Sequence, residues 1–115
     1  MQEYLQVLTA AGTRADACRM ASVLVEKRLA GCVQVIGPIE STYRWKGRVE
    51  RSPEWLCLVK TSQARYNELV SILEAIHPYD VPEILAVPVT RGSGRYLAWL
   101  GRSLKPARRR RRQCR

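Results

Sequence analysis

Residues 31–61 read GCVQVIGPIESTYRWKGRVERSPEWLCLVKT, and this stretch decides the fold of the chain. In its first half, residues 33–45 place apolar side chains at one parity, as residues on one face of a strand do. Lys46-Gly47 then turns the chain, because glycine supplies the positive φ that a tight hairpin needs. On the return, Leu56 and Leu58 fill the second face of an apolar run, which is typical of a strand covered on both sides. The stretch therefore predicts a long β-hairpin.

Two prolines interrupt the predicted strands of this hairpin. Gly37-Pro38 lies in the first strand and Ser52-Pro53 in the second. Because proline has no N–H to donate to a sheet ladder, both steps predict bulges or edge positions. The hairpin is therefore expected to bend where these residues lie.

The segment before the hairpin predicts a strand followed by a helix. Residues 3–9 alternate well enough for a first strand. Thr13 suits a helix N-cap, and Asp16 follows three residues later, near the positive end of the helix dipole. Apolar residues at helical spacing predict a helix over residues 14–30, with Gly31 as its C-terminal stop.

After the hairpin, the sequence predicts another helix and another strand. Thr61 or Ser62 is expected to cap the helix. His77-Pro78 would end it, because the residue before a proline disfavours helical backbone angles. Residues 83–90 predict the last strand, in which Pro88 again indicates an edge or a bulge.

The predicted order is strand, helix, strand, strand, helix, strand, with a short third helix that Ser93 would cap. This order defines an α+β, ferredoxin-like fold (βαββαβ plus a C-terminal helix) with an antiparallel sheet and both main helices on one face. The other face of the sheet carries Leu56 and Leu58, so we expect a partner to cover it. Assembly with further copies of the chain satisfies that requirement.

The net charge of +10 looks like a nucleic-acid signature until its location is considered. Seven of the 20 basic residues lie in residues 105–115, where there is no acid, so residues 1–104 keep 13 basic and 10 acidic residues. We therefore expect one folded domain over residues 1–104 and a basic, disordered tail over residues 105–115. Nucleic acid would bind through the tail, if at all.

The composition also narrows the cellular setting. The apolar runs are far shorter than a membrane span, and the N-terminus lacks the basic start of a signal peptide, which predicts a cytoplasmic protein without membrane contact. The cysteines form no Cys-x-x-Cys pair and are expected to be free thiols in a reducing compartment. They are Cys18, Cys32, Cys57 and Cys114.

Five motifs stand out along the chain: Leu29-Ala-Gly-Cys-Val33, Ser41-Thr-Tyr-Arg-Trp-Lys-Gly47, Leu58-Val-Lys-Thr61, His77-Pro-Tyr-Asp-Val-Pro-Glu-Ile84 and Tyr96-Leu-Ala-Trp99. In this order they resemble the CutA family of divalent-cation tolerance proteins, over about residues 3–104. The resemblance implies a ferredoxin-like protomer in a tight homotrimer similar to the PII signalling proteins. It also implies an association with copper and other divalent cations, and no catalytic reaction.

The resemblance also suggests metal ligands. Some bacterial members are described with ligands at a first-strand cysteine and at a His-His pair before Pro-Tyr. The matching residues here are Thr9 and Ile76-His77, so only His77 transfers. His77 is the candidate ligand for copper or another divalent cation, and the alternative is that it only ends the helix. Cys32 is a second candidate ligand or reactive thiol, and the alternative is a small buried apolar residue.

Polar residues in the same segments suggest a pocket between subunits, with Lys60 as a cation and Tyr79 as a hydroxyl donor. The alternative is that these residues form polar contacts that hold subunits together. The predicted pocket residues are Lys60, Glu50, Tyr79, Glu83 and Tyr96, and the predicted interface anchors are Tyr43, Trp45, Trp55 and Trp99.

Three functions remain open from the sequence. The first is a non-enzymatic, trimeric metal-response protein that binds divalent cations weakly. The second is nucleic-acid binding through the arginine-rich tail. The third is a PII-like sensor of a small anionic metabolite in the cleft between subunits. The sequence contains no phosphate loop, nucleophile elbow or paired-carboxylate motif, which argues against an enzyme.

Overall fold

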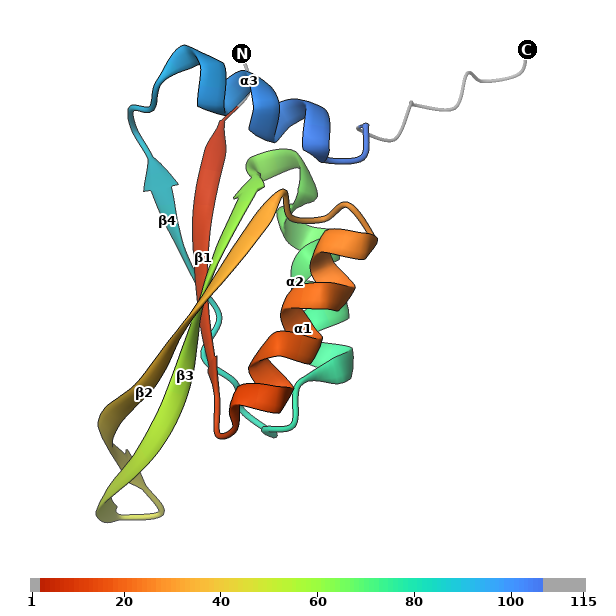
Figure 1. Ribbon diagram of the computed structural model, residues 1–115. Coiled ribbons are helices and arrows are strands. Elements are labelled where there is room, and N and C mark those ends of the chain that lie inside the picture. Colours follow the sequence, from red (N-terminus) through yellow and green to blue (C-terminus); the bar gives the residue numbers. More distant parts are fainter. Residues whose placement is uncertain (1–2, 107–115) are drawn as a thin grey trace.

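The computed structural model describes residues 3–106. Four strands and three α-helices follow one another as the sequence predicts (Figure 1). They are β1 (Tyr4–Ala11), α1 (Arg14–Glu26), β2 (Cys32–Trp45), β3 (Arg48–Ser62), a 3-10 turn (Gln63–Arg65), α2 (Tyr66–Ile76), β4 (Leu85–Val89) and α3 (Gly94–Ser103).

The strands form one antiparallel sheet in the order β2-β3-β1-β4. Helices α1 and α2 lie side by side on one face of it, while α3 lies across one end (Figure 1). This arrangement confirms the predicted ferredoxin-like fold. Pro88 lies in β4, which among the described strands pairs with β1 alone and is an edge strand, as predicted.

The hydrophobic core lies between the sheet and the helices α1 and α2. Alternate residues of the two central strands point into it, among them Val7 and Val59, which pair with each other and are fully buried. From the helices, Met20, Leu24 and Leu73 complete this layer, and each of them is fully buried. The opposite parity of the same strands faces away from the helices.

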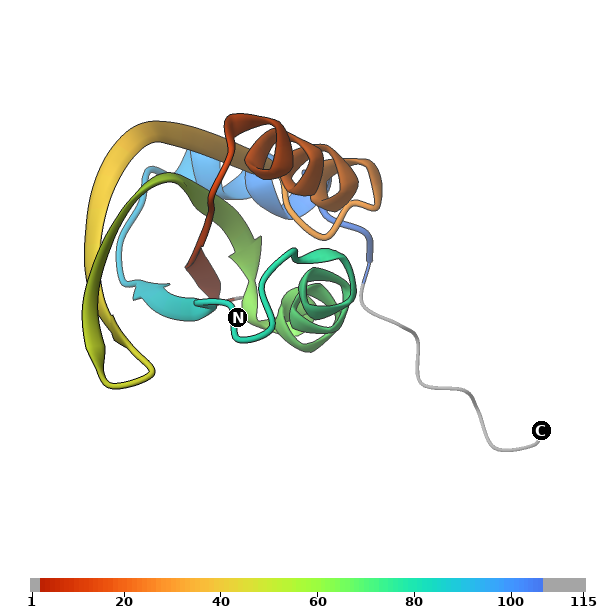
Figure 2. The ribbon, with the colours of Figure 1, turned by 90° about the horizontal axis from the view of Figure 1, so that it is seen from below.

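The β2–β3 hairpin extends past the rest of the sheet and curves around one side of the molecule (Figure 2). Lys46 and Gly47 form its turn with φ values of 51° and 78°, which confirms the predicted position. A register shift between Ile36 and Ile39 places the predicted bulge at Gly37-Pro38. At Ser52-Pro53 there is no bulge, because β3 continues through it and Pro53 pairs with Glu40; of the two predicted alternatives, the edge position is the one found.

Pro53 is tolerated because the last pairing of β1 with β3 joins Ala11 to Trp55. Beyond that point the hairpin is a two-stranded ribbon, so one edge of β3 carries no ladder from β1. The missing N–H of a proline at that edge costs no hydrogen bond within the described sheet.

The C-terminal end of α1 differs from the prediction. The helix ends at Glu26 rather than Ala30, and its reversal comes from Arg28 at φ 59° rather than from Gly31. Gly31 is required for packing instead, because a Cβ there would lie only 2.5 Å from Cδ1 of Leu100 on α3. Glycine at this position therefore lets α3 approach the sheet closely.

The start of α2 also differs from the prediction, since neither Thr61 nor Ser62 caps it. Both residues end β3, and the 3-10 turn follows before α2 begins at Tyr66. The Thr61 hydroxyl instead donates to the Leu29 carbonyl at 2.6 Å. By contrast, the predicted caps at Thr13 and Ser93 are confirmed, because each side chain accepts the N–H three residues later.

The described chain ends shortly after α3. Lys105 is held there, because its N–H donates to the Arg28 carbonyl at 2.9 Å and its Nζ pairs with Glu68 at 2.6 Å. The remainder of the predicted disordered tail, residues 107–115, lies outside the described residues. Over residues 3–106, none of the helices is both long and apolar enough to cross a lipid bilayer.

Candidate functional site

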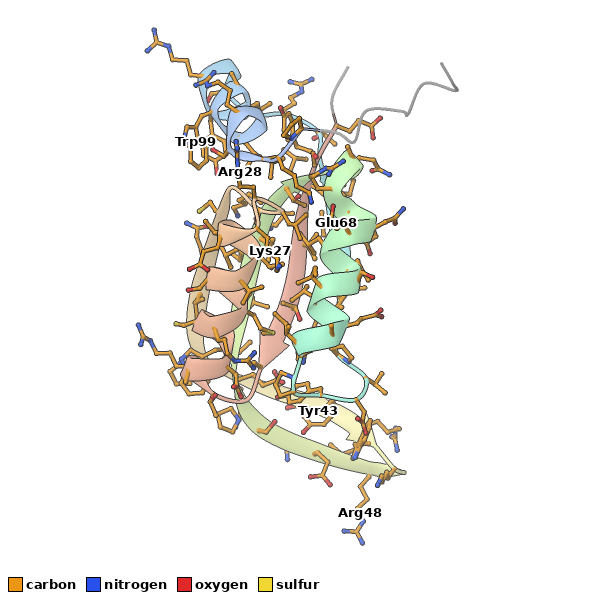
Figure 3. The ribbon with its side chains drawn as sticks, turned by 90° about the vertical axis from the view of Figure 1, so that its right-hand side faces the viewer. Lys27, Arg28, Tyr43, Arg48, Glu68 and Trp99 are labelled. Carbon is orange, nitrogen blue, oxygen red and sulfur yellow. The ribbon has the colours of Figure 1, made fainter. Side chains whose placement is uncertain are left out.

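A cleft opens where the curved hairpin faces the connection between α2 and β4. Its volume is about 730 Å³. Figure 3 places Tyr43 near that connection, at the end of the molecule opposite to Trp99 on α3. The lining residues come from the end of β1, from the hairpin and from residues 78–83: Ala10, Ser41, Thr42, Tyr43, Trp45, Glu54, Pro78, Tyr79, Asp80, Val81 and Glu83.

Tyr79 connects the two sides of this cleft. Its hydroxyl donates to Oε2 of Glu54 on β3 at 2.8 Å. Burial and this hydrogen bond to the Glu54 carboxylate raise the pKa of Tyr79, so it stays a neutral donor. Gly12 leaves room for it, because a Cβ there would lie 3.2 Å from the hydroxyl oxygen.

His77 lies directly behind Tyr79, and both of its ring nitrogens have partners. Nδ1 accepts the backbone N–H of Tyr79 at 3.1 Å. Nε2 lies 3.2 Å from Oγ1 of Thr9, so it carries the proton of the neutral ring and donates to that hydroxyl. Burial lowers the pKa of His77 below its ordinary value of 6.5, which favours this neutral form.

The structure thus brings together Thr9 and His77, two of the residues that match ligand positions in the resembling family. In this chain they bond to each other. Across residues 3–106, no group of three or more His, Cys, Asp or Glu side chains is arranged to hold a metal ion. Cys32 is half-buried at the start of β2, opposite Lys60, and is far along that strand from the cleft-lining residues.

The residues predicted to form a pocket between subunits fall into two groups within one chain. Tyr79 and Glu83 line the cleft, and Glu50 pairs with the cleft residue Tyr43. Lys60 lies towards the opposite end of the sheet, where its Nζ donates to Oε1 of Gln6. A pocket that joins both groups would need more than one copy of the chain, so it stays a prediction.

Tyr96 belongs to the second group and lies on α3. Burial and the neighbouring Cys32 raise its pKa. Its ring packs on Trp99 with centroids 5.5 Å apart, and both side chains remain more than 40% exposed. Such exposed aromatic pairs are suited to contacts with another protein surface.

The other predicted interface anchors differ in exposure. Tyr43 and Trp45 are 42% and 48% exposed on the hairpin, where they line the cleft. Trp55 instead packs against the core, and a Cβ at Gly37 would meet its ring at 2.4 Å. The bulge at Gly37 thus makes room for this indole.

The sequence analysis missed two cleft residues, Glu54 and Asp80. Asp80 stands within the Pro-Tyr-Asp segment that drew attention to Tyr79. Glu54 gave a weaker signal, as a single acid between Pro53 and the apolar run of β3. Only the curvature of the hairpin brings these acids to one cleft.

A second feature is the sheet face that α1 and α2 leave open. Pairing places Leu8 between Leu58 and Leu85 on this face. Ile36, Leu85 and Val87 are 47%, 59% and 48% exposed there. Apolar side chains that gather on one face in this way mark an interaction surface.

The fold and this open face define a small ferredoxin-like domain with a two-sided sheet and a projecting hairpin. The model of the family described as CutA1 divalent ion tolerance protein matches residues 5–103, and the chain belongs to this family. The match covers nearly all of the described residues.

Curated relatives agree with this assignment. A divalent-cation tolerance protein CutA from Thermus thermophilus is 46% identical over 81 residues, which are 70% of this chain and 79% of the relative. The CutA protein of Pectobacterium atrosepticum is 41% identical over 92 residues, 78% of this chain and 84% of the relative. A chloroplastic CutA protein of Arabidopsis thaliana is 41% identical over 76% of this chain, which spans about half (48%) of that relative.

Solved structures show the same likeness. The Cut A1 divalent cation tolerance protein from Thermus thermophilus superposes with a TM-score of 0.85 at 40% identity, covering 91% of this chain and all of that one. CutA1 from Oryza sativa superposes with a TM-score of 0.87 at 33% identity, covering 90% of this chain and 94% of that one.

Proposed function

We propose that this chain is a non-enzymatic protein of the divalent-cation response that works as a homotrimer and binds copper or other divalent cations weakly. The names of its relatives support the cation part of this proposal. The single observation that carries the assembly is the open sheet face with its exposed Leu85 and Val87. Apolar surface of this kind is stabilised by burial against another copy, at about 25 cal/mol per Å².

Weak metal binding fits the geometry of His77. A metal ion at either ring nitrogen must displace the Tyr79 N–H or the Thr9 hydroxyl, and each lost hydrogen bond costs roughly 0.5–1.5 kcal/mol. Residues 3–106 of a single chain supply no group of three ligands around it. We therefore propose that ligands come from more than one protomer.

Two measurements test this proposal. Multi-angle light scattering on the purified full chain should give the mass of three protomers, and a monomer at micromolar concentration would overturn the assembly. Calorimetry with Cu²⁺ and Zn²⁺ should give weak, saturable binding that His77→Ala reduces. Full copper affinity in that variant would remove His77 from the proposal, and no saturable heat in the natural chain would remove metal binding.

The alternatives named in the sequence analysis gain less support. Among residues 3–106, no lysine or arginine lines the cleft, so this part of the chain does not favour a small anion there. The arginines of residues 108–112 lie outside the described residues, and nucleic-acid binding through them stays a prediction. Nucleotides and a short RNA in the same titrations would test both alternatives. The cytoplasmic location also stays a prediction.

A further inference from the structure

The cleft collects negative charge from three separate segments. Glu54 comes from β3, Asp80 from the connection after α2, and Glu83 from the approach to β4. Over residues 3–106, none of these three carboxylates forms an ion pair with a lysine, an arginine or His77. The Glu54 carboxylate accepts the Tyr79 hydroxyl, and within the described chain no cationic side chain pairs with any of the three carboxylates.

Aromatic rings form the other walls of this cleft. Tyr43, Trp45 and Tyr79 all line it, and each is between 37% and 48% exposed. Lys46 at the hairpin tip already lies 6.0 Å from the Trp45 ring centroid, at the outer range of a cation–π contact. Ring faces and carboxylates around one space both attract a positive charge, and the rings add contact area for an organic group.

The arrangement suits an organic cation better than a bare metal ion. The carboxylates are not grouped as metal ligands, since residues 3–106 contain no cluster of three such side chains. The volume of about 730 Å³ lies within the range of small-molecule sites, roughly 300–1,000 Å³. We propose that this cleft binds a small organic cation with an ammonium or guanidinium group.

In this proposal the carboxylates of Asp80 and Glu83 and the Trp45 ring contact the cation. Tyr79 is a positioning residue, because its hydroxyl holds the Glu54 carboxylate at 2.8 Å. Tyr79 is in turn held by His77, which accepts its N–H and packs beside it with ring centroids 5.1 Å apart. The proposal goes beyond metal response and does not depend on it.

The test is calorimetric titration of the full chain, in its native assembly, with spermidine and with arginine amide. We expect saturable binding of at least one of them in the millimolar range or tighter. The double change Asp80→Asn and Glu83→Gln should weaken it by about tenfold or more, because the charge-assisted hydrogen bonds to the cation are lost. The exposed Glu74→Gln on α2 is the matched control and should leave binding unchanged.

Two results would overturn the proposal. One is the absence of saturable heat with either cation up to about 10 mM, a concentration at which even a weak site near 1 mM is filled. The other is binding that the double change leaves intact, or that Glu74→Gln weakens equally, since either would mean general charge attraction. Tyr79→Phe separates the positioning of Glu54 from the packing of the ring. This variant removes the hydroxyl that holds Glu54 and keeps the ring, so it should weaken binding only in part.

The arginines of residues 108–112 carry the same guanidinium chemistry as the probe. A full-length variant with Arg108–Arg112 replaced by glutamine distinguishes the two sources of the cation. Tighter binding of arginine amide in this variant would identify the tail as the natural occupant of the cleft. Unchanged affinity would identify a free small molecule, and both results support the cation site.

Discussion

The guanidinium of Arg28 donates to the carbonyl of Arg102 at 2.7 Å and so joins the end of α1 to the end of α3. It also donates to the carbonyls of Ser103 at 3.1 Å and Leu104 at 3.3 Å. These are the carbonyls that a helix leaves without partners at its C-terminus, where a positive charge is favourable. Figure 3 shows Arg28 beside α3, next to Lys27.

Removing the Arg28 side chain should loosen α3 without disturbing the core. We expect Arg28→Ala to lower the free energy of unfolding by roughly 1–2 kcal/mol in urea titration, because three charge-assisted bonds are lost. Arg28→Gly should cost about 0.5–1 kcal/mol less, since glycine adopts the φ of 59° without strain. The neighbouring Lys27→Ala is the control, and equal loss in that variant would contradict this role.

A charge on the open sheet face should separate the proposed protomers. We expect Leu85→Glu to shift the mass by light scattering from trimer towards monomer, because the carboxylate would be buried without a partner. Val25→Glu is the matched control, since Val25 is exposed on α1, which covers the opposite face. Dissociation by the Val25 change alone would place the interface elsewhere.

The hairpin turn offers a change that should stabilise the protein. Lys46 adopts φ 51° although it is not glycine, and Asn tolerates that region better. Lys46→Asn should raise the free energy of unfolding by a few tenths to about 1 kcal/mol. Gly47→Ala, at φ 78°, should lower it by roughly 1–2 kcal/mol. Changes of the same sign in both variants would contradict the turn geometry.

Cys57 should be the least reactive of the described thiols. Burial raises its pKa from 9.0 to about 11, and its Sγ–H points to the Ala17 carbonyl at 3.8 Å. At pH 8 its thiolate fraction is then roughly 100-fold below that of an unperturbed thiol. Alkylation followed by peptide mass spectrometry should label Cys18 and Cys32, which are half-buried, well before Cys57. Early labelling of Cys57 would mean that the hydrophobic core between the sheet and the helices opens readily.

His77 should make stability depend on pH in a defined direction. Its pKa in the folded chain lies below the ordinary 6.5, so above pH 6.5 both states are neutral and stability is full. As the pH falls below 6.5 the unfolded chain binds a proton first, and stability declines towards the folded pKa. The groups that face His77 include Asp16 and Glu54, which favour the charged ring, and Arg19, which opposes it.

The measurement is the thermal midpoint at fixed protein concentration from pH 7.5 to 5.5. The thermal midpoint of the unmodified chain should fall further over this pH range than that of the His77→Gln variant, because glutamine cannot titrate. Parallel slopes in the two proteins would show that other groups govern this range.

Much of the fold could be predicted because its signals are local. The turn at Lys46-Gly47, the caps at Thr13 and Ser93 and the bulge near Pro38 each depend on a few neighbouring residues. The end of α1 could not be predicted in this way. Arg28 takes a strained backbone angle while its side chain binds carbonyls 74 to 76 residues away, and no periodicity records such a contact.

In the candidate site too, residues with local signals could be predicted, and contacts between residues far apart in the sequence could not. Tyr79 and Glu83 lie in one short segment and were found together. Asp80 lies in that same segment and was overlooked beside Tyr79. Glu54 was missed because it reaches this segment only through the curvature of the hairpin. His77 was found as a candidate ligand, and its contact with Thr9 is visible only once the end of α2 is placed against β1.

The outer part of the β2–β3 hairpin, beyond the pairing of Ala11 with Trp55, forms an arm that links folding to assembly. An isolated two-stranded ribbon is marginally stable in water, so this arm takes its rigidity from whatever it rests on. Dilution to single chains would then soften the arm before the helical layer melts. Ordering of this arm and encounter between chains would be one cooperative event.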